Sequence, residues 1–466
     1  MTPPTAASRR DFLFAAAGGL ASAGLAGCAR GEQVGSRVGA AALSPTNERV
    51  KNVVFVVADG MDHASVMLAD LVSRRRDGRA SPFVSLRADE RTTVGQCMTF
   101  ARDSIVTDSA AAGSAFGIGE HVDNRSINFV DDREPTPILV RARNAGLATG
   151  LVTTTRLTHA TPAAMACNVP SRNLEDAIAE QLLDRRVDVL LGGGAKHFPD
   201  GLLAKHPDLT LVRNANELAS ASSGRLLGLF NDSHLRYSLD RLDAEPSLSM
   251  MTRAALDRLS ASGRGFIMQV EAGRVDHAGH ANDAAGLVHD MLEFNEVVRA
   301  AAEFTDSRDD TLLIVTTDHG TGGPQLTKYM EPGATGIDRI ASARRSFEWI
   351  DEELGGLRAA LDNPGRVREV MEYAAGFDPG MERVDWLVST IRERERGDGF
   401  DEATSPTALL GSVFANGHAV AFTSVNHNAD YVDVLARGPG AERLGRFIDN
   451  VDIHTMMCEG LGIPTA

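Results

Sequence analysis

Short runs of apolar and β-branched residues alternate along the chain with longer segments whose apolar residues recur at helical spacing. The runs end in polar or glycine residues and cover residues 52–58, 150–154, 187–191, 266–270, 311–316 and 431–436. The helical segments include residues 174–183, 248–259 and 284–304. Continuous apolar strands that alternate with helices are typical of a mostly parallel sheet covered on both faces. The pattern therefore predicts an α/β fold, a three-layer sandwich with a central, mostly parallel sheet and helices on both faces.

Residues 325–412 break this rhythm. They are rich in charge, their spacing is helical, and they contain no clear strand. We predict that they form a helical insertion, or cap, on the main fold. The main domain is then expected from residue 49 to residue 466, after a small, polar and flexible tether at residues 28–48.

The first 27 residues have the pattern of an export signal. Arg9 and Arg10 precede a weakly apolar stretch at residues 12–27 that is too short to span a bilayer. This arrangement resembles twin-arginine signals. The sequence LAGC, which ends at Cys28, resembles a bacterial lipobox. We therefore predict an exported protein, periplasmic or at the cell surface, that is anchored to a membrane through a lipidated Cys28. A plain cleavable signal with an incidental cysteine is the alternative.

Composition and charge narrow the function classes. Of 466 residues 43% are hydrophobic and 24% charged, and the formal net charge is −16. These values exclude a disordered chain and a polytopic membrane protein. The acidic balance argues against nucleic-acid binding, because no basic block is available to displace counterions from phosphates. Cys97, Cys167 and Cys458 show no paired spacing, and we expect no disulfide.

Potential metal ligands follow three of the predicted strands. Asp59, Glu271 and the pair Asp318 and His319 each come directly after an apolar run. The carboxyl ends of parallel strands meet at one edge of a sheet, where open α/β sheets place their sites. Any one of these acids taken alone is explained as a helix cap or a loop charge. Together they form a cluster of negative charge that is costly unless cations occupy it, so we predict a metal site.

Further ligands follow Glu271 in the sequence EAGRVDHAGH. If this segment is helical, Asp276 and His280 lie on one face, because they are four residues apart. A mixture of oxygen and imidazole ligands suits zinc, whereas an oxygen-only set suits magnesium. A solvated charged loop is the alternative interpretation.

Ser109 is a candidate nucleophile. It precedes a run of small residues, AAAGSA, that has the composition of a tightly packed helix. A serine at a helix N-terminus can hold an anion and ionise more easily, although Asp108 or Ser109 acting only as the N-cap explains the same pattern. No G-x-S-x-G motif accompanies it, which leaves metal activation as the route to a nucleophile.

Seven segments of the chain resemble the alkaline phosphatase family, in family order from about residue 52 to residue 455. They are VVADGM (56–61), TDSAAA (107–112), THATPAA (158–164), LLGGG (190–194), VEAGRVDHAGHANDAAG (270–286), IVTTDHG (314–320) and NHNADYVDVLARGPGAE (426–442). The insertion at 325–412 is the main stretch without a recognisable motif.

The resemblance implies a site with two zinc ions and one magnesium ion. It gives the first zinc Asp276, His280 and His427 as ligands, the second Asp59, Asp318 and His319, and the magnesium Asp59, Thr161 and Glu271. The second zinc adjoins Ser109, which becomes phosphorylated in the reaction. Arg172 corresponds to the arginine that grips the phosphate.

The activity implied is hydrolysis of small phosphate monoesters to alcohol and inorganic phosphate. A phosphodiesterase of the same superfamily and a non-catalytic metal- or phosphate-binding surface lipoprotein are the alternatives, and a homodimer stays open. The sequence departs from the family pattern at Asp62, where glycine is usual, at His63, at Asn428, where threonine is common, and at His159, where some relatives have aspartate. The changes at Asp62 and Asn428 remove no ligand, and residues at the position of His159 tune the magnesium site in other relatives.

Overall fold

The computed structural model describes residues 50–465 except 222–223, 328–330 and 396–405. The predicted export signal, the tether and Cys28 lie outside these residues. Within them, no helix combines the length and the apolar character needed to cross a membrane. Cys97, Cys167 and Cys458 are free and buried.

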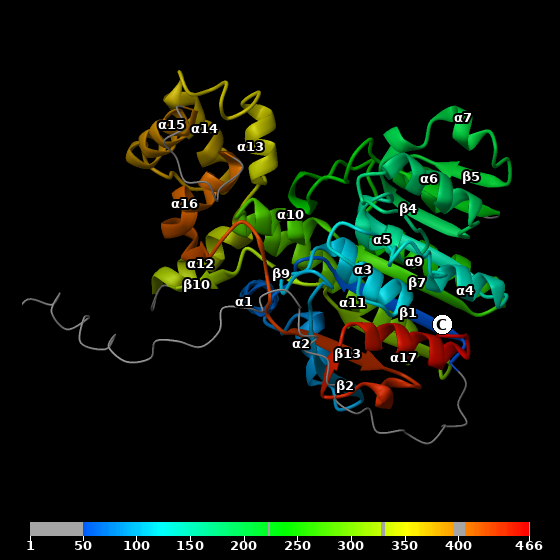
Figure 1. Ribbon diagram of the computed structural model, residues 1–466. Helices are drawn as coiled ribbons and strands as arrows, with labels where there is room; N and C mark the ends of the chain where they lie inside the picture. The colour runs from blue at the N-terminus through cyan, green and yellow to red at the C-terminus, as the bar shows by residue number, and fades with distance from the viewer. Residues whose placement is uncertain (1–49, 222–223, 328–330, 396–405, 466) are drawn as a thin grey trace, which may run out of the picture. The chain divides into compact units, whose positions relative to one another are not determined.

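A ten-stranded sheet forms the centre of the fold (Figure 1). In spatial order its strands are β14 (Phe447–Asp449), β2 (Thr92–Met98), β13 (Val432–Arg437), β8 (Thr311–Thr316), β1 (Asn52–Ala58), β7 (Phe266–Ala272), β3 (Ala148–Arg156), β4 (Val189–Gly193), β6 (Arg225–Leu229) and β5 (Leu209–Val212). Neighbouring strands are parallel except that β13 is antiparallel to both β2 and β8. The prediction of an α/β fold with a mostly parallel sheet is confirmed.

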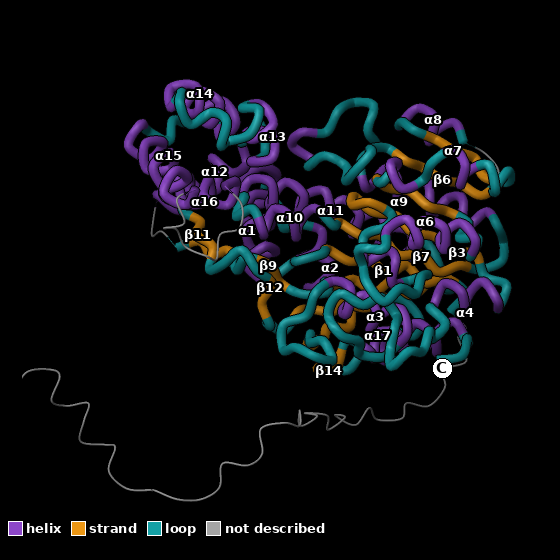
Figure 2. The backbone as a smooth tube through the Cα atoms, turned by 45° about the horizontal axis from the view of Figure 1, so that its top comes forward, coloured by secondary structure: helices purple, strands orange, loops and turns teal. Residues whose placement is uncertain are grey.

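Each face of the sheet carries its own apolar core. Along β1, Val53, Phe55 and Val57 belong to one cluster of buried side chains, and the alternate residues from Val54 to Ala58 belong to a second. Because successive side chains of a strand point to opposite faces, a strand that is apolar throughout must be covered on both sides. Figure 2 shows the strands between helices, as this pattern requires.

The helices divide between the two cores. The first core receives α3 (Ser109–Ile118), α4 (Ile138–Asn144), α5 (Ala160–Ala164), α6 (Glu175–Asp184), α7 (Asp200–Leu203) and α17 (Val451–Leu461). The second receives α1 (His63–Asp77), α2 (Pro82–Ala88), α8 (Ala215–Ser220), α9 (Leu248–Ala261), α10 (Arg274–His280) and α11 (Ala284–Asp306).

Most of the region predicted as an insertion is a bundle of helices with a small core of its own. Its helices are α13 (Phe347–Glu353), α14 (Pro364–Ala375), α15 (Met381–Glu395) and α16 (Pro406–His418). Helix α12 (Glu331–Ser342), which comes before them, instead contributes Ile337 and Ile340 to the second core of the sheet. The chain enters and leaves the insertion through an antiparallel pair, β10 (Pro324–Leu326) and β11 (Val420–Phe422). A second short pair joins β9 (Gly320–Thr321) to β12 (His427–Asn428). The domain boundaries themselves stay a prediction.

Helices α3 and α5 pack unusually closely, because α3 carries glycine at the contact. A Cβ atom added to Gly117 would lie 2.1 Å from the carbonyl oxygen of Ala164 in α5, which no side chain tolerates. This close approach sets the start of α3, with Ser109, beside the helix that carries Thr161.

Candidate active site and metal centre

The carboxyl edge of the sheet gathers the acids that the sequence singled out. Asp59 follows β1, Glu271 lies at the end of β7, and Asp318 and His319 follow β8; all four are fully buried. Strand β1 pairs with β7 on one side and with β8 on the other. The three strand ends are therefore adjacent, as predicted from their sequence positions.

These carboxylates are short of hydrogen-bond partners. Both oxygens of Asp59, Oδ2 of Asp318 and Oε1 of Glu271 are buried and accept no hydrogen bond. Burial, with the charge of Asp318 next, raises the pKa of Asp59 well above its usual range. Burial likewise raises the pKa of Glu271 to about 7. Buried carboxylate oxygens without donors are costly, and divalent cations are the ligands that such a set fits.

Two histidines are oriented by backbone carbonyls. Nδ1 of His280 lies 2.6 Å from the oxygen of Val425, and Nδ1 of His427 lies 2.9 Å from the oxygen of Thr107. A carbonyl accepts, so Nδ1 carries the proton in each ring and Nε2 keeps its lone pair. The two Nε2 atoms lie 3.1 Å apart. Two lone pairs that face each other at this distance are the arrangement that a shared metal ion fits.

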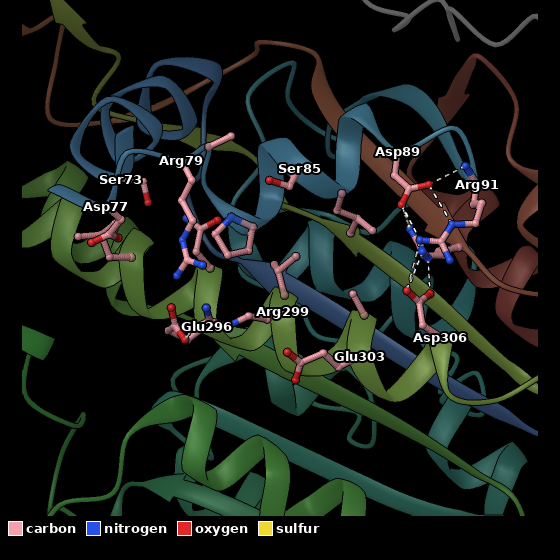
Figure 3. Close-up of a pocket in the computed structure, with 18 of the residues that line it drawn as sticks. Ser73, Asp77, Arg79, Ser85, Asp89, Arg91, Glu296, Arg299, Glu303 and Asp306 are labelled. Atoms are coloured by element: carbon pink, nitrogen blue, oxygen red, sulfur yellow. Dashed lines mark hydrogen bonds and ion pairs between the residues drawn. The ribbon is translucent and has the colours of Figure 1, made fainter. Parts of the chain in front are cut away.

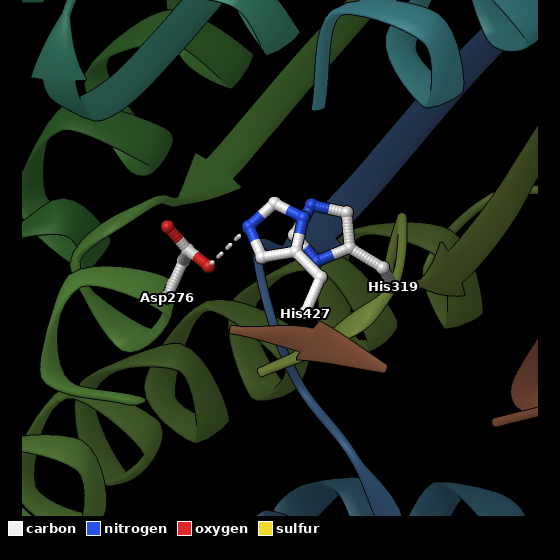
Figure 4. Close-up of side chains that lie close together, drawn as sticks. All are labelled: Asp276, His319 and His427. Atoms are coloured by element: carbon white, nitrogen blue, oxygen red, sulfur yellow. Dashed lines mark ion pairs between the residues drawn. The ribbon is translucent and has the colours of Figure 1, made fainter. Parts of the chain in front are cut away.

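Asp276 completes this side of the site from the helix that the spacing predicted. His280 Nε2 and His427 Nε2 lie 3.4 Å from its two carboxylate oxygens. Figure 4 shows Asp276 and His427 with the ring of His319, which stacks on that of His427. Thr321 donates from Oγ1 to Oδ1 of Asp276 at 2.6 Å. No sequence pattern predicts this contact between Thr321 and Asp276, because Thr321 lies in a two-residue strand with no periodicity of its own.

Three groups in the described part of the chain bring candidate ligand atoms within 4.8 Å of one another. They are Asp276, His319 and His427; Asp59, Asp318 and His319; and Asp59, His159 and Glu271. The second group is the set that the resemblance implied for one zinc. In the first group His319 stands where His280 was expected, although His280 is close by. The third group contains His159 in addition to the expected Asp59 and Glu271. Thr161, which was also expected at the magnesium, is fully buried on the neighbouring helix α5.

Ser109 begins helix α3 and is 2% exposed. The N-cap is Asp108, whose carboxylate accepts from the backbone N–H of Ala111 at 3.0 Å. Ser109 is thus free of the capping role. Its Oγ lies 3.3 Å from Nε2 of His319, one of the candidate metal ligands that follow β8.

Arg172 reaches the same place from the loop before α6. Its Nη1 donates to Oδ2 of Asp108 at 2.9 Å, and its Nη2 donates to Nε2 of His159 at 3.0 Å. The guanidinium fork is therefore held at both ends. Sequence reasoning assigned neither Asp108 nor His159 this positioning role.

Of the departures from the family pattern, Asp62 has a structural role. It caps α1, and its Oδ1 accepts from the backbone N–H of Ser65 at 2.8 Å. Its Oδ2 is buried without a partner, and burial raises the pKa of Asp62 to about 6. His63 beside it has a side chain that is 53% exposed.

A separate cavity of about 320 Å³ lies between α1, α2 and α11 and includes none of the site residues (Figure 3). Acids and arginines line it together. Many of them pair, as Arg91 does with Asp89 at 2.7 Å and Arg437 with Asp306 at 2.6 Å. These charges largely balance, so the cavity lacks the uncompensated negative charge of the sheet edge.

A buried carboxylate and imidazole cluster at the end of a parallel sheet, with a serine and a clamped arginine beside it, defines a metal-dependent hydrolase for an anionic group. A sequence model described as alkaline phosphatase matches residues 50–463, and the chain belongs to the alkaline phosphatase family. Family and site together support a phosphatase enzyme that uses divalent metal ions and acts on phosphate monoesters.

Characterised relatives align over most of the chain. Alkaline phosphatase 4 of Bacillus subtilis (strain 168) is 30% identical over 446 residues, 92% of each chain. Streptomycin-6-phosphate phosphatase of Streptomyces griseus is 33% identical over 360 residues, 62% of this chain and 80% of that one. The crystal structure of Thermus thermophilus alkaline phosphatase superposes with a TM-score of 0.83 at 34% identity, covering 90% of this chain and 93% of the other.

Proposed function

We propose that this protein hydrolyses phosphate monoesters through a phosphoserine intermediate on Ser109, at a site that binds two zinc ions and one magnesium ion. The observation that carries the proposal is the position of Ser109. It is a buried serine that does not cap its helix, and its oxygen lies 3.3 Å from His319, with Arg172 held by the neighbouring Asp108.

The proposed ligands fit the metals chemically. His280 and His427 each keep the Nε2 lone pair free beside Asp276, a ligand set that suits zinc. Asp59 has two oxygens without hydrogen-bond partners, one for the zinc held with Asp318 and His319 and one for the magnesium held with Glu271. Glu271 and Thr161 supply oxygen only, which suits magnesium. When bound, such ions neutralise the charge that develops on the phosphoryl and serine oxygens.

The remaining steps belong to the chain itself. Arg172 binds two phosphate oxygens with its planar fork, a geometry that lysine lacks. Oγ of Ser109 gives up its proton and attacks phosphorus in line with the ester oxygen, the P–O bond to the leaving group breaks, and the leaving alkoxide takes up a proton to become the alcohol. Water then attacks the phosphoserine, so that inorganic phosphate leaves and the Ser109 hydroxyl is regenerated. Charge in such reactions lies mainly on the phosphoryl oxygens, so positioning supplies much of the rate.

Export and anchoring are part of the same proposal. The first 27 residues direct export, and Cys28 is lipidated, which holds the catalytic domain (49–466) at a membrane surface on the tether. Cys28→Ala should release the exported enzyme from the membrane fraction without changing its activity. A variant that stays bound to the membrane would reject the anchor. A homodimer is an additional proposal, which sedimentation equilibrium of the purified protein tests.

Hydrolysis of p-nitrophenyl phosphate at alkaline pH, before and after treatment with EDTA, tests the function. We expect EDTA to abolish activity, and zinc and magnesium to restore it only when both are added. Bis-p-nitrophenyl phosphate is assayed in parallel. Faster turnover of this diester would favour a phosphodiesterase, and turnover of neither substrate by the folded, metal-loaded protein would favour a binding protein.

A further inference from the structure

A line of three side chains runs from the helical insertion to the active site. Glu348 of α13 accepts a hydrogen bond from Nη2 of Arg274, the first residue of α10. Nη1 of the same guanidinium donates to Nδ1 of His277 at 2.8 Å. His277 directly follows the proposed zinc ligand Asp276 on α10. A residue of the insertion is therefore one hydrogen bond away from the metal-binding helix and two hydrogen bonds away from His277.

Arg274 is held firmly in this position. It is 4% exposed, and its guanidinium carbon lies 3.9 Å from the ring centre of Tyr237, stacked on the ring face. A buried arginine needs a counter-charge, and Glu348 supplies it in direct contact. The side chain thus has one orientation, fixed by the stacking, by the carboxylate and by the imidazole.

The insertion is also fixed where it supplies Glu348. The backbone N–H of Phe347 donates to Oδ2 of Asp283 at 2.7 Å, and the backbone N–H of Ser346 donates to Oδ1 of Asp240 at 3.2 Å. Asp283 in turn caps α11, directly after the metal-binding helix. The first turn of α13 is therefore seated on the main domain, and Glu348 lies in that turn.

The contact with Arg274 determines the state of the His277 ring. A guanidinium only donates, so Nδ1 of His277 accepts and the proton of the neutral ring is on Nε2. The ring packs edge-on against His159, with ring centres 5.6 Å apart, and His159 holds Arg172. The ring of His277 therefore lies beside the imidazole that holds the guanidinium of Arg172, and the ring of His234 packs closer still, with ring centres 4.4 Å apart.

We propose that Glu348 and Arg274 are positioning residues, through which the helical insertion orients His277 as a hydrogen-bond donor for the bound phosphoryl group. The inference rests on the proposed function of the site and deepens it, because it gives the insertion a part in substrate binding. Loss of Glu348 leaves Arg274 without its counter-charge and frees the His277 ring to turn or to change tautomer.

A double-mutant cycle between Glu348→Ala and His277→Ala tests this relay in the full-length, metal-loaded protein. The binding constant of inorganic phosphate, measured by calorimetry, and kcat/KM for p-nitrophenyl phosphate are determined for each variant. We expect about a tenfold loss in both quantities for either single variant, which corresponds to about 1.4 kcal/mol, and no further loss in the double variant. Glu352→Ala, an exposed residue one turn later on α13, is the control and should leave both quantities unchanged.

Metal content separates positioning from a structural role and should be unchanged in Glu348→Ala. The unfolding temperature of this variant should fall, because the buried Arg274 loses its counter-charge, so binding and turnover are measured well below that temperature. Additive losses in the cycle, an unaffected Glu348→Ala variant, or a loss of metal in that variant would each overturn the relay. A wild-type protein that binds phosphate without turning over any ester would contradict the proposed function alone, because the double-mutant cycle on phosphate binding would still test the positioning role of Glu348 and Arg274. A wild-type protein that binds no phosphate would overturn both.

Discussion

Replacing Asp108 by asparagine separates two roles that this residue combines. One carboxylate oxygen caps helix α3 at Ala111, and the other accepts from Arg172. Asparagine is as good an N-cap as aspartate, so the first role survives. Its amide nitrogen, however, would face the guanidinium of Arg172, where donor would meet donor. The substitution therefore releases one end of the arginine fork and leaves the helix intact.

The size of the effect follows from the contacts. Arg172 and Asp108 have side chains that are 20% and 18% exposed, so the pair is only partly screened by water. In the Asp108→Asn variant, Nη2 of Arg172 stays bound to His159. The added cost of binding phosphate is therefore the conformational entropy that the Arg172 side chain has gained and loses again in the complex. Ordering one such side chain costs about 0.5–1.5 kcal/mol, which corresponds to about a 2- to 13-fold weaker phosphate complex.

Competitive inhibition by inorganic phosphate is the assay, because it reports phosphate binding without a contribution from the chemical step. We expect the inhibition constant to rise in Asp108→Asn while thermal unfolding stays as in the wild type. Asp108→Ala should raise the inhibition constant similarly and in addition lose about 1 kcal/mol of stability with the cap. An unchanged inhibition constant in Asp108→Asn would refute the clamp, and an equal loss of stability in both variants would refute the separation of roles.

Two further predictions concern stability. Burial raises the pKa of Asp62 from 3.8 to about 6, so the stability associated with its protonated form is lost as pH rises from about 4 through about 6. Asp62→Asn keeps the cap and should be more stable than the wild type at pH 8 by up to about 3 kcal/mol, with little difference at pH 4. Denaturant unfolding at the two pH values measures the difference in stability, and a difference that does not depend on pH would contradict the prediction. Gly117→Ala should destabilise the protein by about 1–3 kcal/mol and reduce activity, because its Cβ meets the Ala164 carbonyl. Gly201→Ala, with no atom within 4 Å of the new Cβ, is the matched control, and equal effects of the two changes in thermal unfolding and turnover would argue against close packing as the cause.

The sequence predicted those parts of the site that follow directly from strand ends. Asp59, Glu271 and Asp318 were placed at one edge because a strand that is apolar throughout must be central, and central strands of a parallel sheet end together. His427 was found only through the family resemblance. It lies in a two-residue strand, and no local periodicity marks such a residue.

The contacts that orient these groups join segments far apart in the chain. Asp108 and Arg172 are separated by 64 positions, and Arg274 and Glu348 by 74. Nothing in the local pattern of one segment indicates its partner in the other. Such ion pairs depend on how the loops and the insertion pack, which hydrophobic spacing does not encode.

Four strands of the sheet were missed, and partial burial accounts for three of them; the fourth, β6, was missed although it is buried along its whole length. Strand β2 is only partly buried and carries Gly95 and the exposed Gln96, and β14 is three residues long. Strand β5 is only partly buried along most of its length. All three lie toward the margins of the sheet, where one-sided or partial burial weakens the apolar pattern that marks a central strand.

The phosphoserine is the central claim, and it can be observed directly. Metal-loaded protein is mixed with p-nitrophenyl phosphate, quenched in acid during turnover and digested, and the mass of the peptide that contains Ser109 is measured. We predict one added phosphoryl group on Ser109 in the wild type and none in Ser109→Ala, which should lack turnover while still binding phosphate and zinc. Full turnover in Ser109→Ala, or a phosphoryl group on a different residue, would contradict the account.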